Sequence, residues 1–310
     1  MLSQEARQRL RQLEFQSRRQ VEEVLQGRYA SLFKGQGVEF AEVREYVPGD
    51  DLRYLDWNVS ARFGKPYVKL NLEERELTLI FLLDNSASMA VSGGLGSKAD
   101  LAAQALAMLS FAALRFGHRV GLVRFAERVE RYIEPQRGHQ HVLRLLGEVL
   151  DRSSWGQGTD LEGALHFFNR VYPRRAVLFY VSDLLDSRLG TPDLSGKSSE
   201  LPESLTRAIS LCCRRHDLSV LRMVAPWERE MPAVGRVRWR DAETGQTAVI
   251  NTGSAVLRRR YAANMTAFSG HWRNLLERSG GSYAEFSSGE ELLGPLLAFM
   301  AGKKRRSLYR

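Results

Sequence analysis

The fold is decided by residues 77–88, which read LTLIFLLDNSAS. The apolar run from Leu77 to Leu83 is interrupted only by Thr78, and it stops at Asp84. A membrane-spanning helix needs about 20 apolar residues, so this run is far too short to cross a bilayer. Its length instead suits a strand that is covered on both faces. We therefore predict a buried strand that ends in a polar loop.

Short apolar runs and helical stretches alternate from this strand to the end of the chain. The alternation is typical of an α/β fold, in which a mostly parallel sheet is doubly wound, with helices on both faces. The expected strands are residues 77–83, 120–125, 176–182, 218–225 and 282–286. The expected helices are residues 98–116, 139–151, 161–171, 203–215, 254–279 and 290–301.

Three further segments do not fit the parallel pattern. Residues 129–133 follow Phe125 after a short turn, whereas a parallel neighbour needs a crossover of roughly a dozen residues. We therefore expect residues 129–133 to form an antiparallel edge strand. Residues 234–239 and 247–250 predict a hairpin inserted near one end of the sheet.

The N-terminal part of the chain follows a different pattern. Residues 1–26 carry apolar side chains at steps near 3.6, which predicts an amphipathic helix. Residues 27–65 are rich in Gly, Asp, Arg and aromatic residues without clear periodicity, which predicts an irregular unit. We expect residues 1–75 to pack as a helix and an irregular segment on a main domain of residues 76–301. A basic tail, residues 302–310, would follow.

Composition narrows the class of protein. With 44% hydrophobic and 26% charged residues, the chain is typical of a folded globular protein rather than a disordered or multi-span membrane protein. The adjacent Cys212 and Cys213 fit neither a disulfide framework nor a C-x-x-C site, and the first residues lack a secretory signal. We therefore predict a cytoplasmic protein without a transmembrane segment.

The net charge of +9 raises nucleic-acid binding as one hypothesis. Most of the excess lies in one terminal run, and such a run is usually a solvated tail. Nucleic acid is therefore the disfavoured partner. Five of the nine charges come from Lys303, Lys304, Arg305, Arg306 and Arg310.

Oxygen-bearing side chains follow the predicted strands where open α/β sheets bind ligands, beyond the strand carboxyl ends. Asp84, Ser86 and Ser88 follow the first strand, Thr159 lies in a second loop, and Asp183 follows a later strand. Hard cations such as Mg²⁺ or Mn²⁺ prefer oxygen ligands. These five residues therefore predict a metal site. Taken alone, the first loop could equally cap the helix near residue 98 or stabilise a turn.

The pattern D-x-S-x-S, then a distant Thr and a later strand-terminal Asp, resembles the metal-ion-dependent adhesion site of von Willebrand factor A domains. The resemblance covers residues 76–301 and implies a Rossmann-type sheet. It also implies that Ser86, Ser88 and Thr159 bind the metal directly, while Asp84 and Asp183 bind through water. Leu184 departs from the family pattern, because many relatives place a glycine there.

The segment upstream of the main domain carries a second resemblance, to the bacterial family called domain of unknown function 58. In that family a comparable segment precedes a von Willebrand factor A-like domain. The Asp and Arg residues of this segment equally suit an ion-pair network that holds it on the main domain. The matching residues are Gly27, Arg28, Gly35, Gly37, Glu39, Phe40, Arg44, Tyr46, Gly49, Asp50, Asp51, Arg53, Asp56, Trp57, Ala61 and Arg62.

These resemblances imply a non-enzymatic, metal-dependent module or adaptor for protein-protein interaction. A Glu or Asp of the partner would complete the coordination of the ion, whether or not the ion is held before the partner arrives. They also imply a companion, a MoxR-type AAA+ ATPase, in the maturation or remodelling of protein complexes. A magnesium-dependent hydrolase is the enzymatic alternative, but the sequence offers no nucleophile elbow, cofactor fingerprint or positioned base. We therefore assign no catalytic residue.

Overall fold

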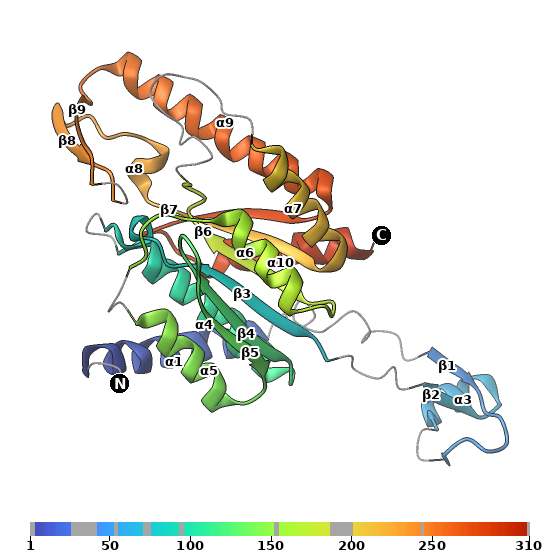
Figure 1. Cartoon of the computed structure of the whole chain (residues 1–310). Coiled ribbons are helices and arrows are strands. Elements are labelled where there is room, and N and C mark those ends of the chain that lie inside the picture. The colour runs from blue at the N-terminus through green and yellow to red at the C-terminus, as the bar shows by residue number, and fades with distance from the viewer. Residues whose placement is uncertain are drawn as a thin grey trace.

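The computed structural model describes residues 4–25, 42–52, 55–70, 76–92, 96–151, 155–186, 201–242 and 245–308. The central strands are β3 (Thr78–Asp84), β4 (Arg119–Phe125), β5 (Val129–Gln136), β6 (Val177–Ser182), β7 (Asp217–Val224) and β10 (Ser282–Ser287). They form one sheet in the order β10-β7-β6-β3-β4-β5 (Figure 1). All neighbours are parallel except β5, which is antiparallel to β4. The predicted α/β class and the antiparallel edge strand are confirmed.

Helices cover both faces of this sheet (Figure 1). One face carries α4 (Lys98–Arg115), α5 (His139–Leu150) and α10 (Leu293–Leu308). The other face carries α6 (Leu161–Val171), α7 (Glu203–Arg215) and α9 (Ala255–Ser279). The short helices η2 (Ala87–Ala90) and α8 (Pro226–Arg229) follow the carboxyl ends of β3 and β7.

The central strand β3 shows why the apolar run was continuous. Ile80 and Leu82 belong to the core beneath α6, α7 and α9, whereas Phe81 and Leu83 belong to the core beneath α4 and α5. Successive side chains of a strand point to opposite faces, and both faces are covered, so every position must be apolar. Asp84 is the first residue at which the strand leaves both cores.

The N-terminal helix α1 (Gln4–Leu25) packs against α4 and α5 as an outer layer. Its Leu13 and Val21 are buried in the same apolar cluster as α4, and Glu14 accepts a hydrogen bond from His139 at 2.8 Å. The predicted amphipathic helix and its packing on the main domain are therefore present in the structure.

Residues 42–70 are more regular than the sequence suggested. Strands β1 (Glu42–Glu45) and β2 (Tyr67–Leu70) pair antiparallel, and α3 (Trp57–Phe63) contacts β2. In Figure 1 this unit stands apart from the central sheet, and the joining residues 26–41 and 71–75 lie outside the described residues. Docking of the unit on the main domain therefore stays a prediction.

The ionic contacts described for this unit are internal. Arg44 Nη2 lies 2.6 Å from Asp50 Oδ1, and Lys65 Nζ lies 2.9 Å from Glu45 Oε1. Asp56 caps α3 by accepting hydrogen bonds from two backbone amides. These charges stabilise the unit itself, and the expected network toward the main domain stays a prediction. Of the predicted signature, Gly27, Arg28, Gly35, Gly37, Glu39, Phe40 and Arg53 lie outside the described residues.

The sequence predicted that the last helix ends at residue 301, and this boundary was wrong. Helix α10 continues to Leu308, through the residues expected to form a solvated tail. Lys303 Nζ donates to Ser219 Oγ at 2.7 Å and lies 3.2 Å from Asp217 Oδ1. A lysine with a long apolar stem can extend a helix along a packed surface while its ammonium finds polar partners. Among the described residues, no helix combines the length and apolarity that a membrane crossing requires.

Candidate functional site

Asp84 stands at the point where β3 leaves the sheet. Its side chain is only 2% exposed. Oδ1 accepts a hydrogen bond from the backbone N–H of Ser86 at 2.8 Å, and Oδ2 accepts one from Ser182 Oγ at 2.6 Å. Because Ser182 ends the neighbouring strand β6, this contact joins the two carboxyl ends on which the predicted site depends.

Ser86 and Ser88 turn toward each other in the loop after β3. Their Oγ atoms lie 3.0 Å apart, and both residues are buried. The Asn85 side chain takes another direction, since its Nδ2 donates to Glu130 Oε2 at 2.9 Å. The alternation of polar residues therefore brings two hydroxyls and one carboxylate into one place.

The loop that carries Thr159 is joined to the Ser86 loop through the backbone. Gly156 N–H donates to the carbonyl of Asn85 at 3.0 Å, and its own carbonyl accepts from Ala87 N–H at 3.1 Å. A Cβ on Gly156 would lie 2.1 Å from Cβ of Ala126, so this approach requires glycine. Thr159 is 3% exposed in this loop.

Asp183, the second predicted carboxylate, is fully buried and has an unexpected cation beside it. Its Oδ2 accepts a hydrogen bond from Lys98 Nζ at 2.6 Å, and its Oδ1 accepts one from Leu185 N–H at 3.0 Å. Lys98 is itself 1% exposed and also donates to Glu228 Oε1 at 2.5 Å. The three side chains form a buried carboxylate-ammonium-carboxylate chain from β6 through α4 to α8.

The electrostatics of the site show an excess of negative charge at Asp84. Burial, and then the negative charge of Asp183, raise the pKa of Asp84 to about 7. Burial alone would lower the pKa of Lys98, but the charges of Asp183 and Glu228 outweigh it and raise that pKa. A buried carboxylate whose ionised form lacks a countercharge fits a site for a cation.

The predicted donor set is rich in hydroxyl groups. Among the described residues, no group of three His, Cys, Asp or Glu side chains is placed to hold a metal. An ion at this edge of the sheet would therefore depend on Ser and Thr oxygens together with Asp84 and Asp183, a set that suits a hard cation. Metal binding by these residues stays a prediction.

Leu184 occupies the position where the sequence departs from the expected glycine. Its φ is 63°, a left-handed backbone conformation that costs L-residues roughly 1–2 kcal/mol. The side chain is 1% exposed and packs in the core beneath α6 and α7. Burial of the leucine offsets a strain that glycine would avoid.

Lys98 and Glu228 are the site residues that the sequence analysis missed. The sequence places Lys98 at the start of an expected helix without assigning it a role, whereas in the structure Ser97 caps that helix and the Lys98 side chain is buried. One signal was available. Acidic side chains are favoured in the first turn of a helix and a lysine is disfavoured there by the helix dipole, so Lys98 needed another reason.

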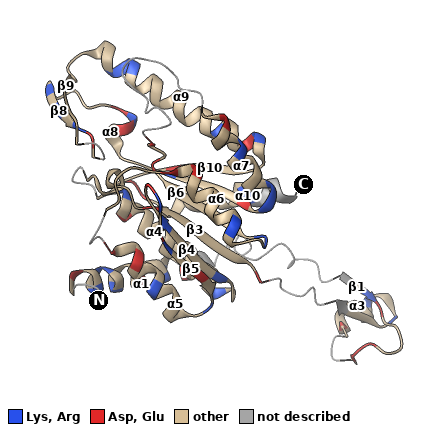
Figure 2. Cartoon of the chain, viewed as in Figure 1, with Lys and Arg blue, Asp and Glu red and all other residues tan. Residues whose placement is uncertain are grey.

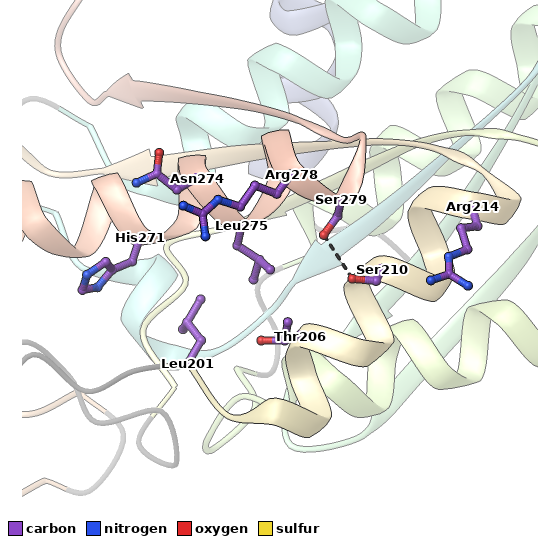
Figure 3. A pocket seen from close by; sticks show the side chains of 9 residues that line it. All are labelled: Leu201, Thr206, Ser210, Arg214, His271, Asn274, Leu275, Arg278 and Ser279. Carbon is purple, nitrogen blue, oxygen red and sulfur yellow. Dashed lines mark hydrogen bonds between the residues drawn. The ribbon is translucent and has the colours of Figure 1, made fainter. Parts of the chain in front are cut away.

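A hollow lies between α7 and α9 (Figure 3). It encloses about 620 Å³ and is lined mainly by polar side chains, including Thr206 and Arg278. Ser210 Oγ and Ser279 Oγ are 3.1 Å apart and join the two helices at its floor. None of the predicted metal ligands lines this groove, so it is separate from the candidate site.

The comparisons with known proteins define the family. Residues 42–269 match the model of the family described as "Protein of unknown function DUF58". The chain therefore belongs to the DUF58 family. It is also 28% identical over 301 residues to "Uncharacterized protein Rv1480" of Mycobacterium tuberculosis, which covers 96% of this chain and 90% of that protein. "Uncharacterized protein Mb1516" of Mycobacterium bovis shows the same identity and coverage.

Several solved structures resemble the chain at low identity. The conserved hypothetical protein BatB from Bacteroides thetaiotaomicron has a TM-score of 0.43 and 15% identity, covering 74% of this chain and 99% of that one. A von Willebrand factor type A structure from Catenulispora acidiphila has a TM-score of 0.39 and 16% identity, covering 75% of this chain and 43% of that one. The neighbours thus include von Willebrand factor A-type domains.

Proposed function

We propose that this protein is a non-enzymatic module for protein-protein interaction that uses a metal ion at the carboxyl edge of its sheet. The observation that supports the proposal is the convergence of Asp84, Ser86 and Ser88. Their loop places two hydroxyl oxygens 3.0 Å apart beside a buried carboxylate whose pKa is raised to about 7. The Thr159 loop and Asp183 border the same place.

In this proposal Ser86, Ser88 and Thr159 bind Mg²⁺ or Mn²⁺ directly, and Asp84 and Asp183 hold water on it. With neutral direct ligands, the ion would keep enough positive charge to accept a Glu or Asp of a partner. The chain's own hydrogen bonds prepare the carboxylates for this role. Ser182 and the Ser86 amide orient Asp84, and Lys98 orients Asp183.

We further propose that the partner is a MoxR-type AAA+ ATPase, or a protein complex that such an ATPase matures or remodels. The support for this partner is the family resemblance of the N-terminal segment. The proposed cytoplasmic location rests instead on the adjacent Cys212 and Cys213, which form no disulfide.

The metal is tested first. An ion that binds only the folded state stabilises it by mass action, so Mg²⁺ or Mn²⁺ should raise the thermal midpoint of the wild type in a saturable way. Ser86→Ala with Ser88→Ala should abolish the rise. Ser110→Ala, which alters a buried serine of α4 away from the site, should retain it. A rise that persists in the double variant would place the ion elsewhere.

The role of the metal in docking is tested by an affinity titration against the MoxR-type ATPase, with Mg²⁺ and with chelator. Thr159→Ala should weaken the complex as chelator does, and chelator should do little further to that variant, because both remove one interaction. Equal affinity under all four conditions would contradict metal-mediated docking. Magnesium-dependent hydrolysis of a phosphate ester, lost in Asp183→Ala, would support the hydrolase alternative instead.

A further inference from the structure

The hairpin between α8 and α9 is a free-standing pair of strands. Strand β8 (Arg236–Arg240) pairs antiparallel with β9 (Thr247–Asn251), and within the described part of the chain these strands pair only with each other. Thr252 closes the base of the hairpin, because its hydroxyl donates to the carbonyl of Gly235 at 2.8 Å and accepts from Val234 N–H at 3.1 Å. The open edges offer unpaired backbone groups to an added strand.

Strand β8 presents a row of arginines. Arg236, Arg238 and Arg240 alternate with Val237 and Trp239, so the three arginines share one face of the hairpin. All three are exposed, and no ion pair joins any of them to another described residue. Figure 2 shows basic positions on β8 and near the start of α9. The row is therefore a positive surface that, within the described residues, forms no ion pair with an acidic side chain.

Exposed aliphatic side chains accompany these charges. Val249 stands opposite Arg238 in the strand register and is 70% exposed. Val234, just before β8, is 62% exposed, and Val256, at the start of α9, is 77% exposed. Large apolar side chains left in water beside unpaired charges are typical of an interaction surface.

The hairpin is connected to the candidate metal site through α8. Helix α8 connects β7 to the hairpin, and its Glu228 accepts from Lys98, which also donates to Asp183. Glu228 Oε2 additionally accepts from Ala225 N–H at 2.9 Å, which fixes the start of α8. The hairpin thus follows the carboxyl end of β7, on the side of the sheet where β3 and β6 also end (Figure 1).

We infer that the β8–β9 hairpin binds an extended acidic segment of a protein partner. The segment adds as a strand to the free edge of β8 and places carboxylates at alternate positions beside the arginines. The residues between them lie on the face of the hairpin that carries Val237 and Trp239. This inference extends the proposed function, because a partner that offers one carboxylate to the ion would carry an acidic segment past this hairpin. Binding of the segment to the hairpin needs no metal. A negative result for the hairpin would therefore leave metal-mediated docking untouched, and the reverse also holds.

The test measures fluorescence anisotropy of labelled peptides with the full chain, in chelator and at low ionic strength, where exposed charges are least screened. The probe is an eight-residue peptide of alternating Glu and Val, and the comparison peptide contains the same residues as a block of four Glu and four Val. The alternating peptide should bind several-fold more tightly than the block peptide, because only its carboxylates match the two-residue period of the arginine row.

Substitutions then locate the binding. Arg236→Glu, Arg238→Glu and Arg240→Glu together should weaken the alternating peptide about tenfold or more, as expected for three exposed ion pairs turned into repulsion. The matched control is Arg170→Glu, Arg174→Glu and Arg175→Glu, three exposed arginines at the opposite edge of the sheet. The control should bind within about twofold of wild type. Arg→Gln replacements at the three hairpin positions guard against misfolding of the Glu variant.

Three results would overturn the inference. Equal loss in the hairpin and control variants would show attraction by net charge alone. Equal affinity for the alternating and block peptides would exclude a strand register. Tighter binding of a single-stranded oligothymidylate than of either peptide, lost only in the hairpin variants, would make the surface a nucleic-acid site.

Discussion

Lys98 lies between two buried carboxylates, Asp183 and Glu228, and the cost of removing it shows what the ion pair does. Lys98→Met should lower the free energy of unfolding by roughly 3 kcal/mol or more, because two buried negative charges lose their shared countercharge. Equilibrium denaturation in urea measures the change.

A double-mutant cycle separates this ion pair from simple packing. Adding Glu228→Gln to Lys98→Met should recover part of the lost stability, since one of the uncompensated charges is removed. Additive losses in the cycle would mean that the Lys98–Glu228 contact contributes nothing specific.

Because of the backbone strain at Leu184, we expect a glycine variant at this position to be more stable than an alanine variant, whereas glycine is usually the less stable of the two. Leu184→Ala should cost about 2–5 kcal/mol, because it opens a cavity and keeps a β-carbon at φ 63°. Leu184→Gly opens the same cavity but relieves the strain, so it should be more stable than the alanine variant by about 1 kcal/mol. Urea denaturation of the two variants checks the order, and an alanine variant that is the more stable would show that the left-handed backbone carries no strain.

The buried His216 makes stability fall in mild acid. Burial, and then the nearby charges of Arg215 and Arg175, lower its pKa to about 4, from an ordinary value of 6.5. As the pH falls from about 7 to 4, the unfolded chain binds a proton at this residue and the folded chain does not. The free energy of unfolding is therefore highest above pH 6.5 and falls toward pH 4, by at most about 3 kcal/mol from this residue.

Replacement of the histidine tests this pH dependence. His216 packs on Phe168 with ring centroids 4.8 Å apart, so His216→Phe retains an aromatic contact and should flatten the decline between pH 7 and 4. His166→Phe, which changes a half-exposed histidine of α6, is the control and should leave the decline in place. Denaturation curves across the pH range decide the point, and parallel declines in all three proteins would rule out His216 as the cause.

At the scale of elements, α10 is held by Lys303 at its C-terminal half. The ammonium contacts Ser219 and Asp217 and lies 5.1 Å from the ring centroid of Phe179. Lys303→Ala removes both the polar contacts and the packed stem, and should cost about 1–3 kcal/mol in the free energy of unfolding. Lys303→Met keeps the stem and should cost less. If Lys303→Ala is as stable as wild type in urea, the contacts of Lys303 do not stabilise α10, and the hypothesis of a solvated tail is supported instead.

At the scale of the whole molecule, α1 completes the layer outside α4 and α5. A chain that begins at Glu76 lacks α1 and should have a lower thermal midpoint and bind more of an apolar dye, because the apolar cluster of α4 becomes exposed. A chain in which a Gly/Ser linker replaces residues 42–70 keeps α1. Its midpoint should also fall if that unit docks on the main domain as predicted. Wild-type stability in both chains would contradict the expected architecture.

Hydrophobic periodicity by itself determined the class of fold and most element positions. The run before Asp84, the helices near residues 161–171 and 203–215, and the edge strand after Phe125 were all predictable, because burial on a strand or helix imposes a local repeat. The apolar repeat of the last helix stops before Lys303, so the sequence predicted an end at residue 301, whereas α10 continues to Leu308. Lysine reads as polar in any pattern, while its apolar stem can lie buried against a neighbouring ring.

The five predicted ligands followed from local order and strand ends, whereas the charges around them depended on the tertiary structure. Asp84, Ser86 and Ser88 are neighbours in sequence, so one turn brings them together. Lys98 meets Asp183 and Glu228 only because α4, β6 and α8 meet at one edge of the sheet. An ion pair selects partners by distance in space, and residues so far apart in sequence leave no periodic signal. The sequence predicted which oxygens follow the strand ends, and only the folded arrangement showed that Lys98 binds Asp183.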